Sequence, residues 1–214
     1  MDQDNIIKIY ARNDNRIQLK MIPGHFVTSQ SHITHYLDLT TMKSRCAEAQ
    51  RIASALAANY EASIPVDTIV CMDGLEVIGA YLAEELTKAG VLSMNPHQTI
   101  YVITPEYTSG SQIILRDNLA PMVRGKHVLI LSASITTGYT VQAAIEAVNY
   151  YGGTVAGLSA IFATTHECLG IPVTSIFDPS SLPDYASFDS RDCPMCKAGQ
   201  HIDALVNSFG YSAL

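Results

Sequence analysis

The sequence has no apolar stretch long enough to cross a membrane, which takes about 20 residues. Its first residues, Met1 to Asn5, also lack the basic start and the apolar core of a signal peptide. From these two absences we expect no membrane partner and a location in the cytoplasm.

Basic side chains are few: 13 lysines and arginines stand against 20 aspartates and glutamates, and the formal charge is −7. No cluster of lysine and arginine offsets this negative charge locally. Because proteins bind nucleic acid largely by neutralising phosphates with basic side chains, we expect no nucleic-acid partner.

Cysteines are also few, and their odd number of five favours reduced thiols over a disulfide framework. Only Cys193 and Cys196 are close in sequence, with the two-residue gap of half a zinc site. His201 is the third candidate ligand, and Cys168, His166 or a second subunit would supply the fourth. The neighbouring proline and glycine favour structural zinc over a redox pair, whereas two free thiols stay an equal alternative.

Apolar residues, in contrast, make up 48% of the 214 residues, enough for a substantial core. Short apolar runs alternate with helical patterns, which predicts an α/β fold with a parallel sheet and helices on both faces. The expected strands are residues 67–72, 100–103, 128–131, 155–162 and 173–177. The expected helices are residues 41–60, 77–89 (closed by Gly90) and 141–150.

One connection, residues 105–126, is unusually long and contains glycines, prolines and a single apolar patch at residues 113–115. Connections of this kind are often a lid or a β-hairpin flap over an active site, and an arm used in dimer contact is the alternative. The tail from Pro179 is rich in turn residues, so we expect it to wrap the core as an extension with a short final helix.

The run VLILSASITTGYT, residues 128–140, has the shape of a phosphate-binding loop, in which a buried strand turns into a helix. The first N–H groups of a helix have no partner within it, and the helix dipole places positive charge there. Threonine hydroxyls add donors, and Gly138 allows close approach of the backbone. The alternative is an ordinary strand-to-helix turn capped by Thr140.

With these residues the chain resembles the type I phosphoribosyltransferases, and most closely the orotate phosphoribosyltransferases. Residues 128–140 are similar to the family's phosphoribosyl pyrophosphate loop, and residues 24–38 to a segment near the N-terminus of the orotate enzymes. Residues 68–83 stand where the family has a strand, a pyrophosphate-binding turn and a helix. Residues 193–199 are similar to a Cys-x-x-Cys segment at the C-terminus of some orotate enzymes.

The resemblance covers nearly the whole chain and implies one phosphoribosyltransferase-like domain, residues 1–214. Its parts would be an N-terminal hood segment (1–40), a core (41–178) with a flap loop, and a C-terminal extension (179–214). The resemblance also implies a homodimer, since the family often builds its sites across two subunits.

The activity that the resemblance implies is a magnesium-assisted displacement, in which a nitrogen base attacks phosphoribosyl pyrophosphate and pyrophosphate leaves. The 5-phosphate would be bound by Thr136, Thr137, Gly138, Tyr139 and Thr140.

Three departures from the family pattern remove charge. Ser132 and Ala133 stand where the family has two acidic residues that hold the ribose hydroxyls. Residues 105–123, in the place of the family's mobile loop, carry only Arg116 as a cation, which would clamp pyrophosphate as a catalytic residue or pair with a neighbouring acid. The strand that ends at Thr165 lacks the arginine with which orotate enzymes grip the base.

The turn Met72, Asp73, Gly74 occupies the place of the family's pyrophosphate turn and carries an unexpected acid. We expect Asp73, with Glu76, to hold a magnesium ion or a ribose hydroxyl in the reaction. The alternative is an acid stabilised by the N-terminus of the next helix.

In the N-terminal segment, Ser31 and His32 replace the family's glycine and lysine. His32 and His35 would face a ligand or lie at a surface or interface.

Two functions stay open from these residues. The first is an orotate-type enzyme that binds phosphoribosyl pyrophosphate or a nucleoside monophosphate and transfers phosphoribosyl to a base. The second is a catalytically degenerate regulator or sensor that binds the nucleotide without turnover.

Overall fold

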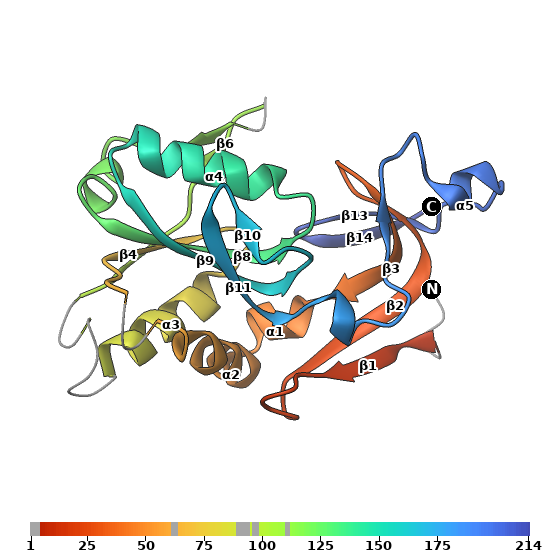
Figure 1. The fold of residues 1–214 in the computed structure, drawn as a ribbon, viewed down its shortest axis with the longest axis horizontal. Helices are drawn as coiled ribbons and strands as arrows, with labels where there is room; N and C mark the ends of the chain where they lie inside the picture. Colours follow the sequence, from red (N-terminus) through yellow and green to blue (C-terminus); the bar gives the residue numbers. More distant parts are fainter. Residues whose placement is uncertain (1–4, 61–63, 89–94, 96–98, 110–111) are drawn as a thin grey trace.

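The computed structural model describes residues 5–60, 64–88, 95, 99–109 and 112–214. Two sheets organise them: a central sheet that carries most of the helices and a second sheet built from both ends of the chain (Figure 1). No helix among the described residues is both long enough and apolar enough to cross a membrane. The expected Gly90 cap lies outside the described residues.

The central sheet has the strand order β10-β11-β9-β8-β4-β5. Its strands pair in parallel except for β10, which is antiparallel to β11. The predicted α/β fold with a parallel sheet is therefore confirmed. The strands are β4 (Thr68–Cys71), β5 (Tyr101–Ile103), β8 (His127–Ile135), β9 (Thr154–Ala163), β10 (Glu167–Cys168) and β11 (Ile171–Phe177).

Helices cover both faces of this sheet, with α4 on one face and α2 and α3 on the other (Figure 1). They are α1 (Thr40–Ser44), α2 (Cys46–Ala57), α3 (Glu76–Lys88) and α4 (Tyr139–Tyr150). Side chains alternate across β4, so Ile69 joins the core under α2 and α3 while Val70 joins the core under α4. The single helix expected at 41–60 is wrong, because Arg45 has extended backbone (ψ 113°) and separates α1 from α2.

The second sheet, which we call the hood sheet, joins the N-terminal segment to the C-terminal extension. Its main order is β12-β3-β2-β13-β14, and β1 also pairs with β2. The prediction that the tail ends in a helix is wrong: a short helix, α5 (Pro194–Lys197), is followed by a β-hairpin. The hood strands are β1 (Ile7–Tyr10), β2 (Gln18–Val27), β3 (His32–Asp38), β12 (Ser187–Phe188), β13 (Ala204–Asn207) and β14 (Gly210–Ala213).

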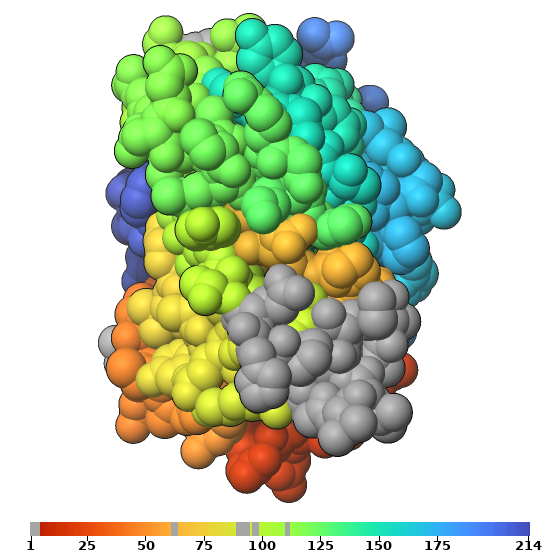
Figure 2. Space-filling view, turned by 90° about the vertical axis from the view of Figure 1, so that its left-hand side faces the viewer, coloured from red at the N-terminus to blue at the C-terminus, as the bar shows by residue number. Residues whose placement is uncertain are grey.

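The long connection forms a hairpin of two short antiparallel strands, β6 (Glu106–Tyr107) and β7 (Ile113–Ile114). A 3₁₀ turn, η2 (Ala120–Met122), then leads to β8, and a second one, η3 (Pro179–Ser181), follows β11. We call residues 105–116 the flap. In the space-filling view, the yellow to green middle of the chain, which includes α3 and the flap, forms most of the visible face (Figure 2).

Helix α3 lies so close to the central sheet that Gly79 leaves no room for a side chain. A Cβ atom at this position would overlap the Sγ atom of Cys71 and lie 3.1 Å from Cγ1 of Val102. The packing of α3 on β4 and β5 therefore depends on glycine, against the preference of a helix interior for alanine.

We predict that Gly79→Ala lowers the free energy of unfolding by about 1–3 kcal/mol, because the added methyl group overfills the core. Denaturant unfolding measures this change. In a Cys71→Ala background the same substitution should have a much smaller effect, since the clashing sulfur is gone. An equal loss in both backgrounds would contradict the packing argument.

Candidate functional site

The predicted phosphate loop lies between β8 and α4. Gly138 is the N-cap of α4 and has a left-handed backbone (φ 80°), which suits glycine. Without a side chain it cannot cap the first turn, so the N–H groups of that turn are left to water or a ligand. Thr164 fixes the loop by donating its hydroxyl to the carbonyl oxygen of Thr136 at 2.7 Å. The alternative of a cap at Thr140 is not observed, because Thr140 lies inside the helix.

A cavity of about 300 Å³ opens beside this loop. One wall comes from the core and the other from the C-terminal extension. Thr34 of β3 holds the extension: its N–H donates to the carbonyl oxygen of Ala186, and its hydroxyl oxygen accepts from the Ala186 N–H. The described residues that line it carry no charge: Thr136, Thr137 and Thr164 from the core, and Pro179, Tyr185, Ala186 and Ser187 from the extension. Tyr139 and Thr140 are exposed at the first turn of α4.

The Asp73 carboxylate contacts Ser132 and Ala133, the two residues that stand where the family has its acidic pair. Its carboxylate oxygen Oδ2 accepts a hydrogen bond from the Ser132 hydroxyl at 2.8 Å and another from the Ala133 N–H at 3.1 Å. Asp73 and Gly74 both have left-handed backbone, with φ angles of 58° and 75°. This conformation is unfavourable for aspartate by about 1 kcal/mol, so the turn stores strain at the point where the carboxylate is placed.

A cation that the sequence analysis missed lies at the same turn. Lys43 of α1 donates to the carbonyl oxygen of Asp73 at 2.9 Å and to that of Ser208 at 2.6 Å. Burial lowers the pKa of Lys43, and the negative charges of Asp73 and Glu76 partly oppose this shift. The Glu76 carboxylate accepts a hydrogen bond from the Thr104 hydroxyl at 2.9 Å.

The flap rests on this turn through Tyr107, whose hydroxyl lies 3.9 Å from the sulfur of Met72. Burial, together with the charge of Asp73, raises the pKa of Tyr107 to about 12, so the phenol stays neutral. Arg116 makes a two-point contact with Glu106, at 2.9 and 2.6 Å, across the hairpin. This is the alternative in which Arg116 pairs with a neighbouring acid.

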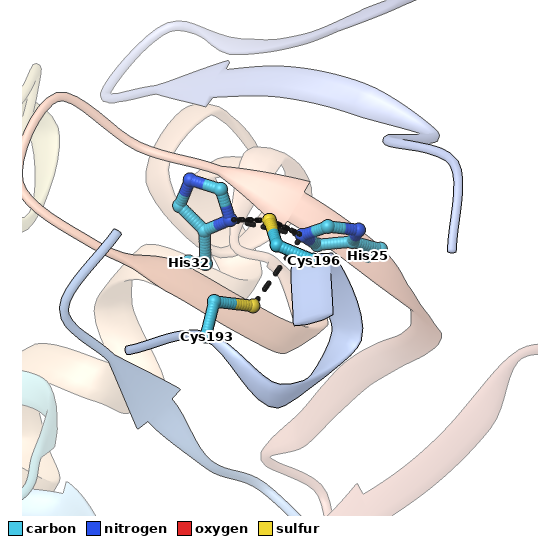
Figure 3. A group of neighbouring side chains, drawn as sticks. All are labelled: His25, His32, Cys193 and Cys196. Atoms are coloured by element: carbon cyan, nitrogen blue, oxygen red, sulfur yellow. Dashed lines mark hydrogen bonds between the residues drawn. The ribbon is translucent and has the colours of Figure 1, made fainter. Parts of the chain in front are cut away.

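The cysteine pair meets two histidines of the hood sheet rather than the ligands expected from the sequence. The ligand atoms of His25, His32, Cys193 and Cys196 all lie within 4.8 Å of one another, and Figure 3 shows the four side chains pointing together. His201 is exposed and is not part of this group.

The fourth ligands that we expected also lie elsewhere. Cys168 is buried beside the phosphate loop, where its Sγ atom lies 3.7 Å from the position of a Cβ on Gly138. His166 is exposed. His35 is buried, and its ring nitrogen Nδ1 bonds to the Thr34 hydroxyl at 2.8 Å rather than to the cysteine pair.

Comparison with known proteins gives no matching family model. The orotate phosphoribosyltransferase of Pelotomaculum thermopropionicum is 26% identical over 201 residues, which cover 93% of this chain and 94% of the relative. That of Desulforamulus reducens is 26% identical over 204 residues, with the same coverage of both chains.

Solved structures of low sequence identity share the fold. An adenine phosphoribosyltransferase from Trypanosoma brucei, in complex with AMP, pyrophosphate and ribose-5-phosphate, has a TM-score of 0.55 at 16% identity, covering 79% of each chain. The adenine enzyme of Thermoanaerobacter pseudethanolicus has a TM-score of 0.51 at 16% identity, covering 82% of this chain and 96% of that one. The resemblance stated from the sequence is thus confirmed, and the fold is that of the type I phosphoribosyltransferases.

Proposed function

We propose that this protein, with its type I phosphoribosyltransferase fold, binds phosphoribosyl pyrophosphate or a nucleoside monophosphate and transfers the phosphoribosyl group to a nitrogen base. The observation that carries the proposal is the cavity whose wall begins at Thr136 and Thr137, next to the first turn of α4. A 5-phosphate at Thr136–Thr140 would place the rest of a nucleotide in this cavity.

Asp73 is the residue that we propose in place of the missing acidic pair. Its carboxylate lies on Ser132 and Ala133, so a negative acceptor stands at the two positions where the loop itself carries none. A carboxylate accepts a charge-assisted hydrogen bond from a ribose hydroxyl, which is about twice as strong as a neutral one. Asp73 of the turn would then accept part of the hydrogen bonds from the ribose hydroxyls that the two acids of the loop accept in the family.

Magnesium would be held at the same turn by Asp73 and Glu76, whose carboxylate oxygens are the ligands that this ion prefers. A bound Mg²⁺ would neutralise charge on the pyrophosphate oxygens. Lys43 adds a positive charge at the backbone of Asp73 and reduces the repulsion between the turn and an anionic substrate.

The base that we propose carries no negative charge. None of the described residues that line the cavity is charged, and β9 ends in Ala163, followed by Thr164 and Thr165 rather than an arginine. Hydroxyl and backbone groups on the extension can hydrogen-bond a neutral base, whereas an anionic base such as orotate would lose water without gaining a cation.

The second candidate function, nucleotide binding without turnover, is favoured by one contact in the flap. Arg116, the cation we expected to cover pyrophosphate, is held by Glu106. A regulator that only senses the nucleotide needs the phosphate loop and the cavity but not a cationic flap. Residence in the cytoplasm and a homodimer stay predictions in both cases.

The deciding experiment mixes the purified protein with phosphoribosyl pyrophosphate, Mg²⁺ and single bases, neutral and anionic. Pyrophosphate release above background supports transfer, and a preference for a neutral base supports our assignment of the cavity. Saturable binding without release supports the sensor. If neither ligand binding nor release is detected by calorimetry and thermal shift, both functions are wrong.

We predict that Gly138→Ala weakens binding of a nucleoside monophosphate about 10-fold or more, because alanine disfavours the left-handed backbone that aims the loop. The matched control is Gly125→Ala, which has the same kind of backbone (φ 67°) at the other end of β8, with open space around it. Both variants should lose about 1–2 kcal/mol of unfolding free energy, but only Gly138→Ala should change the dissociation constant measured by calorimetry. If the two variants bind the nucleotide equally well, the loop is not part of the binding site.

We predict that Asp73→Asn weakens binding of phosphoribosyl pyrophosphate in the presence of Mg²⁺ about 10- to 100-fold, the loss expected for a charged partner. Asparagine tolerates the left-handed backbone and keeps an acceptor oxygen, so the fold should persist. Glu146→Gln, on the exposed side of α4, removes one charge away from the turn and should leave binding unchanged. If Asp73→Asn leaves the affinity unchanged while Gly138→Ala weakens binding, Asp73 has no role in binding, but the loop keeps its role.

A further inference from the structure

We propose that the hood sheet contains a structural zinc site formed by Nε2 of His25, Nδ1 of His32 and the Sγ atoms of Cys193 and Cys196. This metal site is separate from the cavity and does not depend on the function proposed above. It joins strands β2 and β3 to the C-terminal extension: Cys193 follows His25 by 168 residues, and Cys196 follows His32 by 164.

The distances within the group are those of ligands around one small ion. The Sγ atoms of Cys193 and Cys196 each lie 3.6 Å from Nε2 of His25, and that of Cys196 lies 3.3 Å from Nδ1 of His32. Zinc with ordinary bond lengths and tetrahedral angles separates nitrogen and sulfur ligands by about 3.5 Å. The two nitrogens, 2.9 Å apart, need a small ring rotation to reach the spacing of about 3.3 Å that the same geometry gives.

Hydrogen bonding alone does not account for the atoms that meet at His25. Its Nδ1 lies 3.1 Å from the carbonyl oxygen of Gln200, which can only accept, so Nδ1 carries the proton in the neutral ring. Nε2 then has a single lone pair, yet three polar atoms converge on it, from His32, Cys193 and Cys196. A cation at their centre would satisfy all four groups at once.

The surroundings of His25 resemble the outer shell of a metal site. A ligating histidine commonly donates its second ring N–H to a carbonyl oxygen, as His25 does to Gln200. Its backbone is held in turn by Asp203, whose carboxylate accepts the His25 N–H at 2.7 Å and whose own N–H donates to the His25 carbonyl oxygen. His25, His32 and Cys193 are buried, so three of the four ligands are shielded from water.

The ligand types select zinc and a structural role. Two thiolates and two imidazoles suit Zn²⁺, and hard ions such as Mg²⁺ prefer oxygen. Four protein ligands fill a tetrahedral shell and leave no position for substrate or activated water. The extension between β12 and β13 contains only one short helix, so a metal would supply cohesion that packing does not.

The experiment measures zinc in the full-length protein, purified under reducing conditions and then dialysed against one equivalent of Zn²⁺. Elemental analysis should give close to one zinc per chain. Cobalt substitution should give the absorption of a tetrahedral site with thiolate ligands. Removing the metal with a chelator should expose the 189–203 segment to limited proteolysis, while the core stays resistant.

Four variants separate this ligand set from others. His32→Ala and Cys196→Ser, the latter at an exposed position, should bind zinc roughly 100-fold more weakly, as loss of one of four ligands implies. His201→Ala and Cys46→Ser, which change a histidine and an exposed cysteine outside the group, should keep full zinc content.

Three results would overturn the proposal: less than about one tenth of a zinc per chain in the parent protein, a Cys193–Cys196 disulfide under reducing conditions, or zinc loss in His201→Ala as large as in His32→Ala. The first two are measured on the unmodified chain, so they hold even if a variant fails to fold.

Discussion

The parallel register of β4 and β8 is the constraint on which the candidate site depends. Cys71, the last residue of β4, pairs with Leu131, whereas β8 continues to Ile135, so the turn that follows β4 lies beside Ser132 and Ala133 of β8. From there the Asp73 carboxylate reaches Ser132 and Ala133 without any long side chain. A shift of one residue would turn these side chains to the opposite faces and separate the turn from the phosphate loop.

The central sheet and the turn from β8 into α4 could be predicted from the sequence because their signals are local. Buried parallel strands appear as short apolar runs, and Gly138 marks the turn into α4. The hood sheet could not be predicted in this way, since its pairs join the two ends of the chain: Ala204 lies opposite Phe26, and Phe188 opposite His32. Strands of two to four residues in the extension are too short to show a periodic pattern.

The same reason explains the ligands and the cation that sequence reasoning missed. His201 is close to Cys196 in sequence, whereas the fold brings His25 to Cys196 from the other end of the chain. His25 occupies a shift in register between β2 and β3, an irregularity with no local signal in the sequence. Lys43 precedes Asp73 by 30 residues in sequence. It contacts the turn from the short helix α1, which the extended backbone of Arg45 separates from α2.

The departures from the family pattern are connected through the turn rather than independent. Ser132 and Ala133 stand where the family pattern has two acids, and the turn carries one acid at the same place, held in a strained backbone by two hydrogen bonds. An acid there would repel pyrophosphate, and Lys43 lies on the same backbone and opposes that repulsion. The flap, in contrast, keeps its arginine on Glu106 and contributes the neutral Tyr107 to the turn. The acid and the cation thus meet at one turn in this chain, and under the proposed function this arrangement would favour recognition of the ribose end of the substrate over capture of the leaving pyrophosphate.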